Sequence, residues 1–156
     1  MARLLIVLGM GGHTSQILRL VNSLGEEYRY EYVVGHDDKT SVNKIKFPGK
    51  VYKMCNPRLM KDKSVIKVFF NMFPATINAF KILWKARSRT IISAGPSLTI
   101  PLFWLAKLMG MKTIFLESWV RVHHGSITGK LVYPVSDLFL VQWETMKKVY
   151  PKAVYA

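Results

Sequence analysis

Residues that could bind an anion or move a proton gather first in the stretch "GMGGHT" at positions 9–14. Its glycines follow an apolar run and precede a pattern typical of an amphipathic helix. Glycine lets the backbone approach a ligand closely, and a helix start offers unpaired N–H groups and a positive dipole end. We therefore predict a phosphate site that includes Gly11, Gly12 and Thr14. A tight turn without a ligand is the alternative.

His13 lies within this stretch, and an imidazole can both accept and donate a proton. It could contact a phosphate or relay a proton, or it could brace the first helix, and the glycine loop favours the functional role. A dinucleotide fingerprint would require Gly or Ala where Thr14 stands. Because Asp37 and Asp38 follow the second predicted strand, where a ribose-binding acid could lie, a nicotinamide cofactor remains an alternative.

A second glycine turn, "SAGPSLT" at 93–99, also follows a strand-like run and precedes a helix. Pro96 suits a first helical turn, and Ser97 could cap the helix. Together with Gly95, this loop and the first one could hold a diphosphate between two helix N-termini. Either loop taken alone is also ordinary for a strand-to-helix connection.

The third segment is "FLESWVR" at 115–121, in which Glu117 is the only acid between Asp62 and Asp137. A carboxylate there could act as general base or orient a sugar hydroxyl. An ion pair with Arg121 is the structural alternative. The neighbouring "HHGS" at 123–126 does not predict a metal site, because adjacent histidines point in different directions on most backbones.

These segments need a scaffold that brings the ends of strands together. Strand-like runs at 3–8, 28–34, 50–54, 90–93, 112–116 and 137–141 alternate with helical patterns at 14–24, 64–87, 97–109 and 144–149, and Pro74 should kink or divide the longest helix. This alternation predicts an α/β fold of the Rossmann type, a mostly parallel sheet with helices on both faces. Such sheets bind ligands beyond the carboxyl ends of their strands. With 156 residues and no internal repeat, residues 1–156 are expected to form one domain.

Composition narrows the classes of partner. The chain carries 23 Lys and Arg against 9 Asp and Glu, a net charge of +14, so nucleic acid, an anionic membrane and an acidic protein are the candidates. A single cysteine, Cys55, rules out an intramolecular disulfide and a cysteine-based metal site. The glycines at 9–12 interrupt the first apolar run before a signal peptide forms, and no run reaches the roughly 18 apolar residues of a membrane span.

Residues 58–89 form a basic and aromatic segment with the pattern of a helix that lies in a membrane interface. An apolar face packed on the sheet with a rim of solvated charges is the alternative. Nucleic acid is not expected, since no motif for it is present and the aromatics sit in an apolar run. The predicted membrane contacts are Lys63, Lys67, Phe69, Phe70, Phe73, Lys81, Trp84 and Lys85.

Three stretches together resemble one known family. They are "GMGGHTSQIL", "ISAGPSLTIPLFWLAKLMGMKTIFLESWVRVHHGSITGKLVYPVSDLFLVQWE" and the closing "PKAVY". The family is the Alg14-like one, the membrane-associated, acceptor-side subunit of a two-subunit N-acetylglucosaminyltransferase. The residues that carry the resemblance, besides the glycine loop, are Asp38, Ser41, Glu117, Ser118, Arg121, Ser126, Gly129, Lys130, Asp137, Gln142 and Trp143. More distantly, the glycine loop, Gly95 and Glu117 are similar to the N-terminal half of the bacterial peptidoglycan N-acetylglucosaminyltransferase.

The resemblance implies one half of a split GT-B glycosyltransferase. This chain would bind a polyprenyl-diphosphate-linked sugar at the cytoplasmic face of a membrane, the plasma membrane in a prokaryote or the endoplasmic reticulum in a eukaryote. A separate subunit would bind UDP-N-acetylglucosamine, and this chain alone would be inactive, with no metal or other cofactor of its own. His13 and Glu117 become candidate catalytic groups, and Gly11, Gly12, Thr14, Gly95, Ser97 and Arg121 the expected diphosphate-binding residues.

Three alternatives to this function stay open. The chain could be a scaffold that anchors a catalytic partner, or a subunit of an exopolysaccharide-synthesis transferase with another sugar. An NAD-dependent Rossmann enzyme is the third. Eukaryotic members of the family begin with a transmembrane helix, whereas this sequence begins on its first predicted strand. The family also continues beyond the position of Ala156 into a short tail thought to dock the partner.

Overall fold

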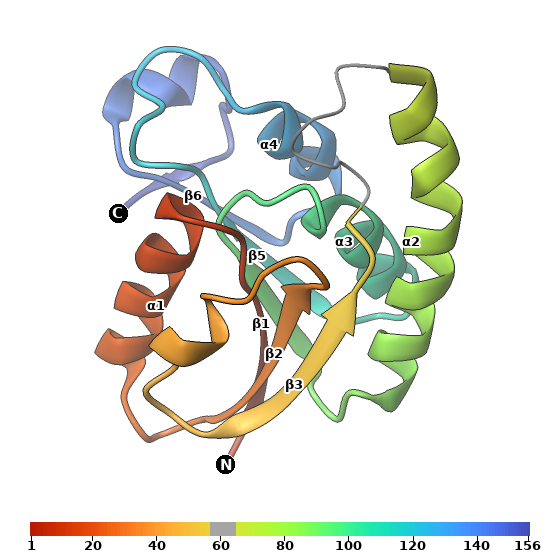
Figure 1. Ribbon diagram of the computed structural model, residues 1–156. Helices are drawn as coiled ribbons and strands as arrows, with labels where there is room; N and C mark the ends of the chain where they lie inside the picture. The colour runs from red at the N-terminus through yellow and green to blue at the C-terminus, as the bar shows by residue number, and fades with distance from the viewer. Residues whose placement is uncertain (57–64) are drawn as a thin grey trace.

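The computed structural model describes residues 1–56 and 65–156, and for 65–71 only the course of the backbone. Within these residues seven strands form one sheet in the order β3-β2-β1-β4-β5-β6-β7, and every neighbouring pair is parallel (Figure 1). The strands are β1 (Arg3–Val7), β2 (Arg29–Gly35), β3 (Gly49–Met54), β4 (Thr90–Ser93), β5 (Lys112–Leu116), β6 (Leu138–Val141) and β7 (Val154–Tyr155). The predicted parallel α/β sheet is confirmed.

Helices cover both faces of this sheet (Figure 1). The described helices are α1 (Gly12–Leu24), α2 (Val65–Lys85), α3 (Thr99–Leu108) and α4 (Ile127–Val132), with 3₁₀ turns η1 (Val42–Lys44), η2 (Tyr133–Val135) and η3 (Glu144–Lys148). Because strand side chains alternate, Leu5 and Val7 of β1 pack toward α2 and α3, whereas Leu4 and Ile6 pack toward α1. Burial of both faces explains why β1 is an unbroken apolar run.

α2 is one continuous helix of 21 residues, so Pro74 does not divide it, whereas the alternative of a kink at Pro74 stays a prediction. Pro74 is exposed on the outer surface of the helix. At such a position water can bond to the carbonyl that a proline leaves without its helical N–H partner. The helix therefore continues past the ring.

Several short elements differ from the expectation. The predicted helix at 144–149 is the 3₁₀ turn η3, and α4 and the two-residue strand β7 were not predicted. α4 begins inside a segment rich in glycine and serine, where Ser126 caps it by accepting a hydrogen bond from the N–H of Gly129 at 2.8 Å. Elements this short bury too few residues to leave a periodic pattern in the sequence.

Candidate functional site

A cleft of about 500 Å³ lies beyond the carboxyl ends of the strands, where the α/β architecture predicts a ligand site. The segments that follow β1, β3, β4 and β5, together with the start of α4, contribute to it. Among the predicted residues, those that line the cleft are His13, Gly95, Ser97, Ser118, Arg121 and Ser126. Sequence reasoning missed the other lining residues, which are Met10, Asn56, Pro96, Val120, Ile127 and Thr128.

His13 is held in a defined orientation at this cleft. Its Nδ1 lies 2.6 Å from the carbonyl oxygen of Ala94, which can only accept, so Nδ1 carries the proton. In the neutral ring Nε2 then has a free lone pair and can take a proton from a hydroxyl. Gly95 permits the contact, because its φ is +101° and a Cβ there would lie 2.9 Å from Cε1 of His13.

The two predicted glycine loops meet, as expected for loops that follow neighbouring strands β1 and β4. A Cβ on Gly9 would lie 2.7 Å from Cβ of Pro96, so the backbone of the first loop packs directly against the second. Ser97 does not cap α3 as predicted. Its hydroxyl donates to Oδ1 of Asn56 at 2.9 Å, and this bond ties the second loop to the segment after β3. Asn56 could have been found from its place directly after a strand.

The side chain of Thr14, a predicted phosphate-binding residue, is turned away from the cleft. Thr14 is fully buried, and its hydroxyl donates to the carbonyl of Gly9 and lies 2.8 Å from Oγ of Ser41. Gly11 and Gly12 are exposed at the start of α1 and do not line the cleft. The hydroxyl of Thr14 braces the loop from behind, because it satisfies a carbonyl that the tight turn leaves without a backbone partner.

Asp38 and Ser41 act on the same loop. Oδ1 of Asp38 accepts from the backbone N–H groups of Thr40 at 3.1 Å and Ser41 at 2.9 Å, and Oγ of Ser41 donates to the carbonyl of Gly9 at 3.0 Å. Burial raises the pKa of the Asp38 carboxyl, but the bonds from Ser41 and Thr40 outweigh it, so the pKa lies below its usual value. Asp38 is thus turned inward rather than toward a ribose.

Glu117 is buried, with 1 % of its surface exposed, and does not line the cleft. Oε1 accepts from the N–H of Ser118 at 2.9 Å. Oε2 accepts from the N–H and hydroxyl of Ser126 at 3.1 and 3.2 Å and from the hydroxyl of Tyr150 at 3.0 Å. The three bonds from Ser118 and Ser126 hold both ends of the loop 118–126. The contacts favour a positioning role, and proton transfer by Glu117 stays a prediction.

Close packing around the Glu117 carboxylate explains why positions 125 and 129 are glycines. A Cβ on Gly129 would lie 2.4 Å from Oε2 of Glu117, and one on Gly125 would lie 2.1 Å from the hydroxyl of Tyr150. Burial and the charge of Glu117 raise the pKa of Tyr150, so its hydroxyl stays a donor. Sequence reasoning missed Tyr150, which lies 33 residues beyond Glu117 without a motif of its own.

The alternative ion pair between Glu117 and Arg121 is not formed. Arg121 is exposed and lines the cleft, and the ion pair found among the described residues joins Lys107 and Asp137. Arg121 thus keeps its positive charge available to an anion in the cleft. The cleft thus contains a guanidinium that can bind a negative charge, from Arg121, and a ring nitrogen that can accept a proton, Nε2 of His13.

Residues behind the cleft brace the segment 117–121. Nε2 of Gln16 donates to the carbonyl of Glu117 at 2.8 Å, and Nε1 of Trp143 donates to the carbonyl of Trp119 at 2.6 Å. Gln142 is half-buried, and Lys130 is exposed on α4.

Among the described residues no group of three His, Cys, Asp or Glu side chains could hold a metal ion, and His123 and His124 are exposed.

The described part of the predicted membrane segment carries a row of exposed apolar side chains on α2. Phe73, Ile77, Phe80 and Trp84 are 73 %, 44 %, 47 % and 74 % exposed, at the spacing of one helix face. Lys81 and Lys85 are exposed beside them. Lys63 and the side chains of Lys67, Phe69 and Phe70 lie outside the described residues. The alternative of an apolar face packed in the core describes the opposite side of α2, where Ala75, Ala79, Ile82 and Leu83 are buried. It does not explain the exposed apolar row.

The helices that the structure describes are each too short or too polar to cross a bilayer.

Residues 4–156 match the protein family described as "Oligosaccharide biosynthesis protein Alg14 like". The chain belongs to this family. Its curated Alg14 relatives include the mouse and human proteins named "UDP-N-acetylglucosamine transferase subunit ALG14". The mouse protein is 32 % identical over 98 % of this chain and 81 % of its own length, and the human protein is 31 % identical over 97 % and 80 %. The family resemblance drawn from the three sequence stretches is confirmed.

Solved structures show where else the fold of this Alg14-like chain occurs. MurG of Acinetobacter baumannii superimposes with a TM-score of 0.69 at 16 % identity, over 90 % of this chain and 40 % of that one. A UDP-N-acetylglucosamine 2-epimerase superimposes with a TM-score of 0.73 at 10 % identity, over 97 % and 44 %. These likenesses confirm the Rossmann-like fold, which here corresponds to less than half of each larger chain.

Proposed function

We propose that this chain is the acceptor-binding subunit of a transferase that moves N-acetylglucosamine from UDP-N-acetylglucosamine to a polyprenyl-diphosphate-linked sugar. Membership of the Alg14-like family carries the coarser statement, a subunit of a glycosyltransferase. The cleft supports the finer statement, because the fixed imidazole of His13 and the exposed guanidinium of Arg121 both line it. A sugar diphosphate presents a hydroxyl and a compact negative charge, which suit these two groups.

The reaction balances with His13 as the base. The acceptor hydroxyl oxygen forms a bond to C1 of N-acetylglucosamine, the bond from C1 to the UDP oxygen breaks, and the hydroxyl proton passes to Nε2 of His13. Attack opposite the leaving group inverts the configuration at C1. Arg121 and the backbone at Gly95 to Ser97 bind the acceptor diphosphate, and Glu117 keeps the loop that carries Arg121 in place.

The donor nucleotide is bound by a separate subunit, which this chain brings to the membrane. The name of the mammalian relatives, a transferase subunit, supports a partner of this kind. The exposed apolar row on α2, with Lys81 and Lys85 beside it and a net charge of +14, supports attachment to the anionic cytoplasmic leaflet. Without its partner the chain is inactive.

The first test is the role of His13 in the reconstituted complex with the donor-binding subunit. H13A and H13N are each expected to lower kcat by roughly 10²–10⁴-fold. The asparagine amide can still donate to the carbonyl of Ala94, so H13N retains the brace but not the base. H123A is the matched control, because His123 is exposed and does not line the cleft, and it should keep full activity.

Full activity of H13N would remove His13 from the reaction. It would favour the alternative of a scaffold whose partner carries all of the chemistry. Assays with acceptors that differ only in the first sugar decide between this acceptor and the exopolysaccharide alternative. The family membership lends no support to the NAD-dependent alternative, which tight NAD binding by the chain would revive.

A further inference from the structure

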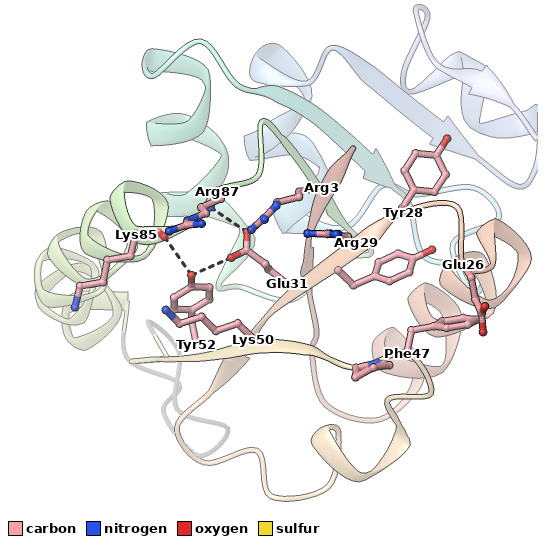
Figure 2. A pocket seen from close by; sticks show the side chains of 12 residues that line it. Arg3, Glu26, Tyr28, Arg29, Glu31, Phe47, Lys50, Tyr52, Lys85 and Arg87 are labelled. Carbon is pink, nitrogen blue, oxygen red and sulfur yellow. Dashed lines mark hydrogen bonds between the residues drawn. The ribbon is translucent and has the colours of Figure 1, made fainter. Parts of the chain in front are cut away.

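A second cleft, of about 600 Å³, lies at the amino edge of the sheet, opposite the candidate site. Figure 2 shows the side chains that line it. Five cationic side chains line it, and each comes from a different element or turn. Arg3 begins β1, Arg29 begins β2, Lys50 lies near the start of β3, Lys85 ends α2, and Arg87 lies in the turn before β4. We call these five residues the cationic cleft.

The register of the strands places these cations together. Arg3 of β1 pairs with Arg29 of β2, and Lys50 of β3 pairs with Glu31 of β2. Paired residues of parallel strands point to the same face, and Leu5 and Val33, two residues further on from Arg3 and Glu31, pack toward α2 and α3. The three strand cations therefore lie on the face that α2 covers, at the point where α2 ends.

Glu26 and Glu31 also line the cleft, and they offset only part of the charge of the cationic cleft. Glu31 is buried, and its carboxylate accepts from the hydroxyl of Tyr52 at 3.1 Å, the N–H of Arg87 at 3.0 Å and the hydroxyl of Ser88 at 2.6 Å. Glu26 lies at the other end of the cleft (Figure 2). No carboxylate of the described residues comes within 4.0 Å of a cationic nitrogen of the five side chains.

Five cations outnumber two carboxylates in this cleft, so the excess positive charge favours a bound anion. The carboxylate of Glu31 accepts hydrogen bonds from hydroxyl and amide donors, and these bonds hold the turn that contains Arg87. The positive charge that exceeds the acidic charge therefore faces solvent in the cleft. Guanidinium groups bind the oxygens of phosphate in a bidentate manner, which makes three arginines and two lysines suited to a doubly charged phosphate group.

The position of the cleft indicates where such a phosphate comes from. Lys85 directly follows Trp84, the last residue of the exposed apolar row, and the rings of Phe80 and Trp84 are 6.0 Å apart on the same helix end. If these rings enter a bilayer interface, the cationic cleft lies at the depth of the lipid headgroups.

We propose that the cationic cleft binds a phosphomonoester group, supplied by an anionic lipid headgroup such as that of phosphatidic acid. The lipid source rests on the membrane attachment proposed above, whereas the phosphate chemistry does not. Because the cleft lies at the edge of the sheet opposite His13 and Arg121, a headgroup and the sugar acceptor can be bound together. The bound headgroup orients α2 along the membrane.

The test compares vesicles of phosphatidylcholine mixed with phosphatidic acid or with phosphatidylglycerol, adjusted to the same zeta potential. The full chain is expected to bind the phosphatidic acid vesicles at least about tenfold more tightly. R29Q/R87Q should lose this preference and keep its binding to phosphatidylglycerol. K147Q/K148Q removes two exposed charges from η3, outside the cleft, and should keep the preference. Thermal unfolding of each variant verifies that it folds.

Soluble glycerol 3-phosphate tests the chemistry without a membrane. It should raise the Tm of the wild-type chain and of K147Q/K148Q, but not of R29Q/R87Q. Protection by glycerol 3-phosphate without a preference among vesicles would overturn the lipid source and support the phosphate site. Absence of both would overturn the site. Absence of binding to every vesicle, with protection retained, would contradict membrane attachment alone.

Discussion

Glu117 is an acidic residue whose contacts favour positioning of a loop over direct proton transfer. As the lone acid of a long basic stretch it suggests a base, yet both carboxylate oxygens are occupied by donors from Ser118, Ser126 and Tyr150. An ionised carboxylate suits this site because it accepts at every lone pair and donates nowhere. Its contacts fix the loop from which Arg121 reaches the cleft.

We expect E117Q to destabilise the protein and to impair activity through the loop. A glutamine amide would direct N–H groups at donors of this site, at a cost of about 1–3 kcal/mol in the free energy of unfolding. Urea denaturation measures this cost, and kinetics of the complex should show a rise in KM for the acceptor. Y150F removes one donor only and should lower stability less. Unchanged stability with a kcat loss of about a hundredfold or more would instead identify Glu117 as the general base.

Asp38 makes a pH-dependent contribution to stability. Its folded-state pKa lies below the usual value, so the ionised carboxylate stabilises the fold above that usual value. This contribution should disappear as the pH falls through the lowered folded-state pKa. D38N is therefore expected to reduce the free energy of unfolding at pH 7, with the difference from wild type shrinking below about pH 4. A difference that stays constant in denaturation curves from pH 7 to pH 3 would contradict this assignment.

At the scale of elements, α2 has two apolar faces, one buried and one exposed to solvent. Ala75 and Ala79 are buried in the core, whereas Phe73 and Trp84 are among the most exposed apolar side chains described. A helix that is apolar on both faces needs two apolar neighbours. The described chain supplies one of them, and we propose that a membrane interface supplies the other.

We expect the chain to bind anionic vesicles in a salt-dependent way through this outer face. F73S/W84S should weaken binding about tenfold or more, because each large ring loses roughly 1.5–3 kcal/mol of apolar burial. L108S is the matched control, since Leu108 is 81 % exposed on α3, and it should bind like wild type. Flotation at rising salt measures both effects. Equal binding of F73S/W84S and wild type would show that the outer face of α2 is not the contact.

At the scale of the whole molecule, the two edges of one parallel sheet carry two clefts of different chemistry. The carboxyl edge has the imidazole of His13 and the guanidinium of Arg121, and the amino edge has the cationic cleft around a satisfied Glu31. The fold corresponds to less than half of each of two larger solved chains with which it superimposes. We propose that two subunits divide the two substrates of the transferase between them.

The purified chain should therefore show no sugar transfer by itself. Addition of the donor-binding subunit should restore transfer of N-acetylglucosamine from UDP-N-acetylglucosamine to a polyprenyl-diphosphate-linked acceptor. Radiolabelled donor and extraction of the lipid product measure both states. Robust turnover by the single chain, free of any co-purifying subunit, would overturn the division of labour.

The amino-acid pattern alone determined the parallel sheet and the edge at which its site lies. Apolar runs alternating with amphipathic ones leave few other ways to bury both faces of a sheet, and parallel strands bring their carboxyl ends together. His13, Gly95, Ser97 and Arg121 were therefore foreseen as neighbours, and the structure brings them to one cleft.

The tertiary structure decided which way the polar side chains turn. Thr14 and Glu117 follow strands as His13 and Arg121 do, yet they turn inward, where they contact Ser41 and Tyr150, which are distant in sequence. The cationic cleft likewise left no motif. Its five residues are spread over positions 3–87, and only strand register and the end of α2 bring them together. Side-chain direction depends on partners across the sheet, which local sequence does not encode.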